Sequence, residues 1–81
     1  MCGIIGILSK QPVKDLILKG LKKLEYRGYD SSGISILDNS KNIHTFRAKG
    51  KLEKLKKKLN KNSINGHIGI GHTRWATHGV P

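Results

Sequence analysis

The chain begins Met1-Cys2-Gly3-Ile4-Ile5-Gly6-Ile7-Leu8, and this stretch predicts that the fold starts with a β-strand. From Cys2 to Leu8, small residues alternate with branched apolar residues, which is typical of a buried strand. Gly3 and Gly6 further indicate that another group approaches the strand closely. We therefore expect the N-terminus to lie inside a β-sheet.

Cys2 is the only cysteine and the second residue of the chain. Aminopeptidases remove the initiator methionine when the next side chain is small, so we expect Cys2 to carry a free α-amine after loss of Met1. An α-amine titrates near pH 8, so about a tenth or more of it is neutral at pH 7 and can accept the thiol proton. Cys2 would then be an N-terminal nucleophile with its own general base. The alternative is a buried cysteine that packs as a small hydrophobic residue.

The next segment has the pattern of an amphipathic helix. Pro12 suits its first turn, and the helix should end near Gly28. Its apolar positions fall on one face at helical spacing. They are Val13, Leu16, Ile17, Leu21 and Leu24.

Extended and helical patterns alternate along the rest of the chain. They predict hairpin strands at residues 33–37 and 43–48, a second helix at 51–59, a loop at 60–66 and a short strand at 68–71. The second helix is lysine-rich, and its stripe of three leucines lacks an aromatic anchor, which favours packing on the sheet over binding to a membrane. This order of elements predicts an α+β fold rather than repeated βαβ units.

The length of 81 residues is enough for one small domain that buries only part of its surface. Sixteen Lys and Arg against five Asp and Glu give a formal charge of +11, which keeps a small basic nucleic-acid-binding module open as an alternative. Thirteen of the sixteen are lysine, a bias that base composition alone can produce. A single cysteine forms no intramolecular disulfide and no signal sequence precedes it, so we expect a cytoplasmic location.

Two segments concentrate polar groups between glycines, residues 25–33 and residues 71–79. In the second, the planar fork of Arg74 suits bidentate capture of a carboxylate, and Trp75 can cover such a site. An isolated Arg-Trp pair can equally be a surface cation–π contact. The spacing of Cys2 and the histidines argues against zinc, and we expect no metal and no cofactor.

Together, these segments resemble the class II glutamine amidotransferases, whose glutaminase domain is an N-terminal nucleophile hydrolase. The resemblance rests on Cys-Gly-Ile at 2–4, Leu-Glu-Tyr-Arg-Gly-Tyr-Asp-Ser at 24–31 and Gly-His-Thr-Arg-Trp-Ala-Thr-His-Gly at 71–79. The last two motifs are most similar to the branch that aminates fructose 6-phosphate, although another class II amidotransferase remains an alternative.

The resemblance implies a catalytic Cys2 and a set of glutamine-binding residues. The thiol of Cys2 would attack the glutamine carboxamide to give a γ-glutamyl thioester and ammonia, and water would then release glutamate. Arg74 would hold the glutamine α-carboxylate with help from Thr77 and His78, and Trp75 would belong to a loop that closes over the substrate. Arg27 would lie beside the nucleophile.

The resemblance also implies a four-layer αββα sandwich, of which residues 1–81 would form about the first half. The family's oxyanion-hole Asn-Gly, its Asp for the glutamine α-amine and its sugar isomerase domain have no counterpart in these residues. Loss of one oxyanion donor can cost about 10²- to 10³-fold in rate, so we expect the segment alone to be inactive. The family further implies a homo-oligomeric complete enzyme with fructose 6-phosphate as the ammonia acceptor and no membrane.

Overall fold

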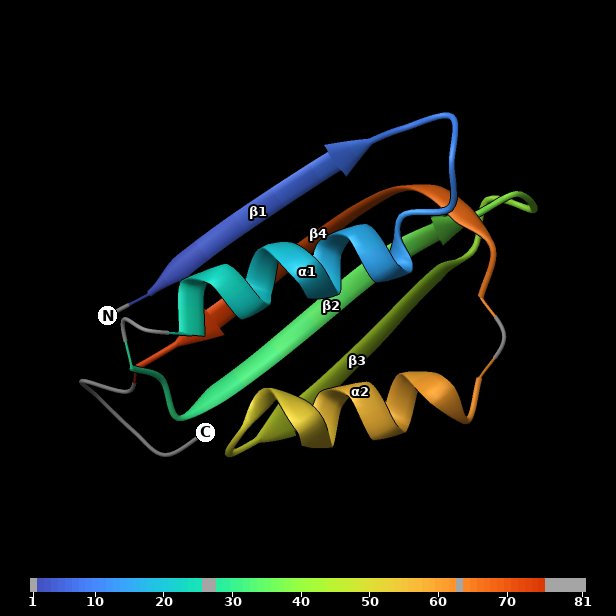
Figure 1. The fold of residues 1–81 in the computed structure, drawn as a ribbon. Coiled ribbons are helices and arrows are strands. Elements are labelled where there is room, and N and C mark those ends of the chain that lie inside the picture. The colour runs from blue at the N-terminus through green and yellow to red at the C-terminus, as the bar shows by residue number, and fades with distance from the viewer. Residues whose placement is uncertain (1, 26–27, 63, 76–81) are drawn as a thin grey trace.

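The computed structural model describes residues 2–25, 28–62 and 64–75, which form one antiparallel sheet with two helices on one of its faces (Figure 1). The elements are β1 (Gly3–Leu8), α1 (Lys14–Leu24), β2 (Ser31–Asp38), β3 (Ile43–Lys49), α2 (Leu52–Asn60) and β4 (Gly66–Arg74). The strand order is β1-β4-β2-β3, so the last strand lies between the first two. All three pairings are antiparallel, which confirms the predicted α+β fold.

The two helices cover the sheet side by side. α1 packs on β1 and β4, whereas α2 packs on β3 and β2 (Figure 1). Asp15 in the first turn of α1 stabilises the helix by interacting favourably with its dipole, and so do Lys22 and Lys23 in the last turn. The core lies between the helices and the sheet and comprises Val13, Ile17, Leu21, Ile34, Ile36, Ala48, Leu52, Leu55, Leu59 and Ile64. The three leucines of α2 are thus buried against the sheet, as predicted. No helix of the described residues is long and apolar enough to cross a membrane.

β4 differs most from its sequence prediction. It runs from Gly66 to Arg74 and occupies the centre of the sheet, whereas the sequence predicted a short strand after a loop. Glycines stand where apolar side chains would otherwise mark the buried face, so the strand lacks the usual alternation. A Cβ on Gly69 would lie 2.6 Å from Ile17 Cδ1, and one on Gly71 would lie 2.5 Å from Ile17 Cγ2. These glycines let α1 approach the central strand closely.

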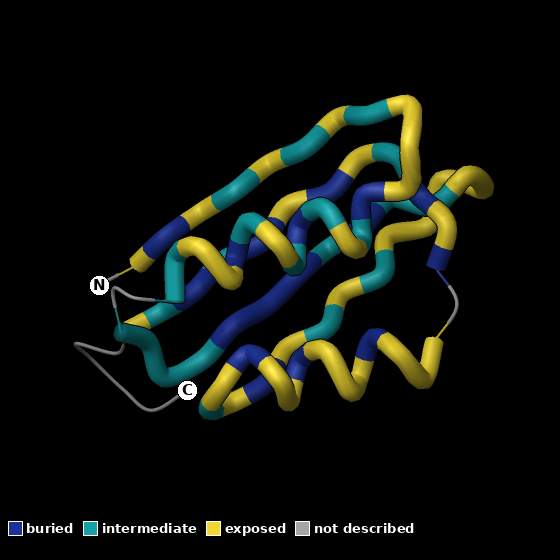
Figure 2. Tube along the Cα trace, viewed as in Figure 1, coloured by how far each residue is buried: buried dark blue, intermediate teal, exposed yellow. Residues whose placement is uncertain are grey.

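β1 is an edge strand, and the prediction of a buried strand is wrong for one of its two faces. Ile4 and Leu8 are 81% and 79% exposed because the helices cover only the other face of the sheet. Figure 2 shows this alternation of burial along β1. Close approach occurs at Gly3, where a Cβ would lie 2.8 Å from Leu24 Cδ1, but not at Gly6, where the nearest atom would be 3.8 Å away.

The first helix and the hairpin have slightly different limits from those predicted. α1 ends at Leu24 rather than near Gly28, with Glu25 as its C-cap. The hairpin is confirmed, but β2 begins two residues earlier than predicted, at Ser31. Gly28, Tyr29 and Asp30 therefore lie directly before a central strand.

Candidate functional site

Cys2 is an exposed free thiol immediately before β1. Its exposure rules out the alternative of a cysteine buried as a small hydrophobic residue. Because Gly3 is packed under Leu24 and paired with β4, the residue that follows Cys2 is held firmly at the end of the sheet.

Cys2 and the described parts of the two polar segments, residues 25–33 and 71–79, meet at this end of the sheet. Gly3 of β1 pairs with Thr73 of β4, and Thr73 pairs on its other side with Ser32 of β2. Cys2 precedes and Arg74 follows the same Gly3–Thr73 pair, so both lie at one end of neighbouring strands. Arg74 in turn pairs with Ser31. Segments that are far apart in the sequence thus become neighbours through the central position of β4.

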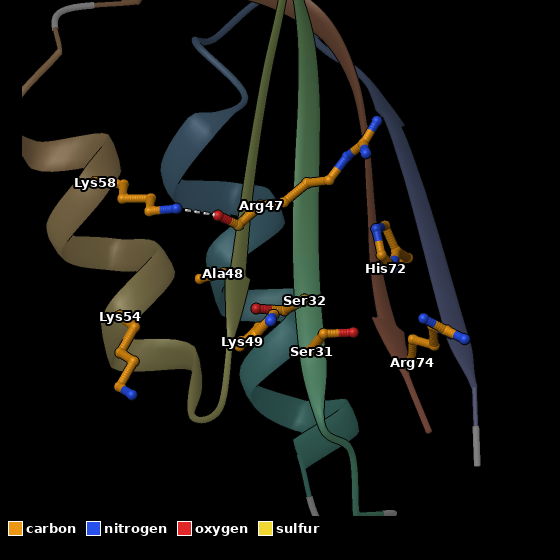
Figure 3. Close-up of a pocket in the computed structure, with 9 residues that line it drawn as sticks. All are labelled: Ser31, Ser32, Arg47, Ala48, Lys49, Lys54, Lys58, His72 and Arg74. Atoms are coloured by element: carbon orange, nitrogen blue, oxygen red, sulfur yellow. Dashed lines mark hydrogen bonds between the residues drawn. The ribbon is translucent and has the colours of Figure 1, made fainter. Parts of the chain in front are cut away.

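Arg74 is fixed by the backbone of the segment before β2. The Asp30 N–H donates to the Arg74 carbonyl oxygen at 2.7 Å. In Figure 3 the side chains of Arg74, His72 and Arg47 leave the sheet on the face opposite the helices, which we call the open face. A guanidinium on this face can bind a carboxylate through two parallel hydrogen bonds.

His72 lies between the two arginines of the open face. Partial burial and the positive charges of Arg47 and Arg74 hold the pKa of His72 below its ordinary value of 6.5. Its imidazole is therefore neutral at pH 7, and the positive charge at this end of the sheet comes from the arginines. Gly33 makes room for the ring, because a Cβ there would lie 2.5 Å from His72 Nε2.

Two hollows adjoin these side chains. The smaller, of about 200 Å³, lies on the open face between Gly33, Thr45, Arg47 and His72. The larger, of about 750 Å³, is lined by the residues drawn in Figure 3. Because His72 and Arg74 lie on one side of the sheet and Lys54 and Lys58 on the other, the larger hollow wraps around the sheet and is not one enclosed cavity.

The predicted site residues divide into two groups. Cys2 and Arg74 meet at one end of the sheet, and Trp75, which is 51% exposed, follows directly after β4. The other three lie outside the described residues: Arg27, Thr77 and His78.

Sequence reasoning did not single out Arg47 or Ser32. Arg47 faces the open side of β3 two pairs along from the Cys2 end, and Ser32 is buried in β2. The pairing of β2 with β4 brings them to the site, and no local pattern in the sequence indicated that pairing. Among residues 2–25, 28–62 and 64–75, no group of three His, Cys, Asp or Glu side chains lies close enough to hold a metal ion.

Solved structures with the same arrangement define the class of protein. A glutamine phosphoribosylpyrophosphate amidotransferase from B. subtilis matches 96% of this chain and 17% of its own length with a TM-score of 0.78 and 25% identity. A second structure, the allosteric regulatory enzyme of purine biosynthesis, matches 99% of this chain and 17% of its own with a TM-score of 0.80, and at 24% identity it shows the fold alone. The fold is that of the N-terminal nucleophile amidotransferases.

Curated relatives narrow the class to one family. The chain is 53% identical over 81 residues to the glutamine–fructose-6-phosphate aminotransferase (isomerizing) of Geobacillus kaustophilus and 59% identical over 80 residues to that of Bartonella quintana. No protein-family model matches the chain. The chain belongs to the family of these aminotransferases and spans 13% of the length of each of these two relatives, at their N-terminal end.

Proposed function

We propose that this chain supplies the nucleophile and part of the glutamine site of a glutaminase domain that releases ammonia for the amination of fructose 6-phosphate. The observation that carries the proposal is the identity of 53–59% to the aminotransferases across the chain. Independent support comes from Cys2, whose exposed thiol beside the end of β4 is accessible to a substrate.

The chemistry proceeds in two steps. With Met1 removed, the α-amine of Cys2 takes the thiol proton, and the thiolate attacks the carboxamide carbon of glutamine. The C–N bond breaks as the nitrogen is protonated and leaves as ammonia, so that a thioester remains on Cys2. Water then attacks the thioester, releases glutamate and returns the proton to sulfur.

The remaining predicted residues bind glutamine. Arg74 pairs with its α-carboxylate, and Thr77 and His78 add hydrogen bonds to the same group. Trp75 covers the bound substrate, and Arg27 lies beside the nucleophile. Support for Arg74 comes from its position one residue beyond the Gly3–Thr73 pair and from the neighbouring positive charge of Arg47.

The open face is the side on which we place the rest of the domain. Ile4, Leu8, Ile43, Ile68 and Ile70 are all exposed large apolar side chains, and such a patch is unusual on a surface that faces water. A second sheet packed on this face would complete the αββα sandwich. Without it the segment alone should be inactive, since part of the site would be missing.

The proposal extends to the setting of the complete enzyme. We place it in the cytoplasm, where a free thiol stays reduced, and we expect a homo-oligomer without a nucleic-acid partner. The competing proposal of a basic nucleic-acid-binding module predicts a complex whose affinity falls steeply as salt rises. Absence of any salt-sensitive complex would exclude that module.

The experiment uses the protein expressed from its own gene. Intact mass should show loss of Met1, and the protein should hydrolyse glutamine and aminate fructose 6-phosphate. Cys2→Ala should abolish glutamine hydrolysis. Retention of Met1, or undiminished hydrolysis by Cys2→Ala, would show that Cys2 is not the nucleophile. Amination of a different acceptor would show that the protein is another class II amidotransferase.

A further inference from the structure

Two buried hydroxyl groups lie one row of residues in from the end of the sheet that carries Cys2 and Arg74. Ser32 and Thr73 pair across β2 and β4, and they are 1% and 2% exposed. Among the described residues, neither Ser32 Oγ nor Thr73 Oγ1 has a hydrogen-bond partner. Buried hydroxyls without a partner are rare because they have lost their bonds to water, so this pair requires an explanation.

The Thr73 hydroxyl lies against Gly3, the residue that follows the proposed nucleophile. A Cβ on Gly3 would be 3.2 Å from Thr73 Oγ1, so the Thr73 hydroxyl is in contact with the Gly3 backbone region on the helix side of the sheet. Gly3, Thr73 and Ser32 form one row across three strands. The next row outward holds Arg74 and Ser31, with Cys2 beside them.

Packing alone does not call for hydroxyl groups at these positions. Farther along the same face of β2 stand Ile34 and Ile36, which are fully buried in the core. An apolar side chain would therefore serve equally well at Ser32 if its role were only to fill space. The change from apolar to hydroxyl side chains occurs at the end of the sheet where Cys2 lies.

We infer that Ser32 and Thr73 are positioning residues that bind one buried water molecule between the sheet and α1 and thereby fix Gly3 and Cys2. A buried water needs two to four polar partners, and the two hydroxyls supply two of them. This inference rests on the proposed role of Cys2 as nucleophile.

The test uses the complete protein with three variants of this pair and one control. Thr73→Val removes the hydroxyl but keeps the shape of the side chain, Thr73→Ser keeps the hydroxyl, and Ser32→Ala removes the second hydroxyl. Ser40→Ala makes the same change as Ser32→Ala in the exposed hairpin turn. The readouts are the kcat and KM of glutamine hydrolysis and the melting temperature.

A small displacement of the nucleophile lowers kcat without weakening substrate binding. We expect Thr73→Val and Ser32→Ala to lower kcat roughly tenfold to a hundredfold, with KM almost unchanged and the melting temperature lower by about 2–4 °C. Thr73→Ser should restore most of kcat, and Ser40→Ala should behave as the wild type.

Three results would overturn the inference. An unsatisfied hydroxyl can be replaced by a methyl group of the same shape without loss, or with a gain, of stability, so an unchanged or higher melting temperature of Thr73→Val would exclude the bound water. Equal loss of kcat in Thr73→Ser and Thr73→Val would exclude a role for the hydroxyl, as would a rise in KM alone. If the wild type hydrolyses no glutamine, the proposed function fails, while the order of melting temperatures still tests the water site.

Discussion

Substitution of Gly71 by alanine should loosen the contact between α1 and the central strand β4. The new Cβ would lie 2.5 Å from Ile17 Cγ2 and 3.2 Å from Leu21 Cδ1, and both of these side chains are fully buried. Neither can turn into solvent, so α1 must move away from the sheet or change its packing.

The cost can be estimated from two opposing effects. Overpacking of a core costs about 1–3 kcal/mol. The lower conformational entropy of alanine in the unfolded chain returns about 0.4–1 kcal/mol. We therefore expect Gly71→Ala to lower the free energy of local opening by about 1–2 kcal/mol.

Hydrogen exchange in the complete protein measures this change where it occurs. The amides of β4 should exchange about five- to thirtyfold faster in Gly71→Ala, which corresponds to the same 1–2 kcal/mol. Ile17→Ala in the same background should relieve the clash, because it removes Cγ2. Ile17→Val should not, because valine retains that methyl group.

An unchanged exchange rate of the β4 amides in Gly71→Ala would refute the reasoning. So would equal behaviour of the two Ile17 variants in the Gly71→Ala background. Either result would mean that α1 does not pack closely enough on β4 for a Cβ at residue 71 to clash with Ile17.

Three further predictions concern the site, the hairpin and the open face. Arg74→Lys should raise the KM for glutamine about tenfold to a hundredfold and change kcat less, because lysine cannot form the bidentate pair with a carboxylate; an unchanged KM would remove Arg74 from the carboxylate site. The pKa of Asp38 is held below 3.8 by its hydrogen bond with His44 Nε2 at 2.7 Å and by backbone N–H groups of the turn. Its stabilising contribution is therefore complete above the unfolded pKa and is lost as the pH falls through the lower, folded pKa. Asp38→Asn should melt earlier than the wild type at pH 7, and the difference should shrink below pH 3.8; a difference independent of pH would contradict this. Ile70→Lys, at a side chain that is 59% exposed on the open face, should lower the melting temperature of the complete protein if a second sheet covers this face. Asn39→Lys in the exposed hairpin turn is the matched control. Equal melting temperatures of the two variants would mean that no second sheet covers the open face.

Where the hydrophobic pattern is local, the sequence predicted the fold well. The stripe of α1 and the leucines of α2 repeat at helical spacing, and the cluster at residues 38–42 separates two β-rich runs, so both helices and the hairpin were confirmed. The terminal position of Cys2 likewise marks it as a candidate nucleophile from the sequence alone. These features depend only on residues that are close in the sequence.

The tertiary structure decided which segments became neighbours. Insertion of β4 between β1 and β2 joined the Cys2 end, Ser31 and Arg74, and it buried the hydroxyls of Ser32 and Thr73 beneath them. Strand pairing between distant segments is set by how well whole faces pack, and the glycines of β4 remove the alternation by which a local pattern would have revealed it. The sequence thus determined most of the elements and the candidate nucleophile Cys2, whereas the order of the strands decided which groups surround Cys2.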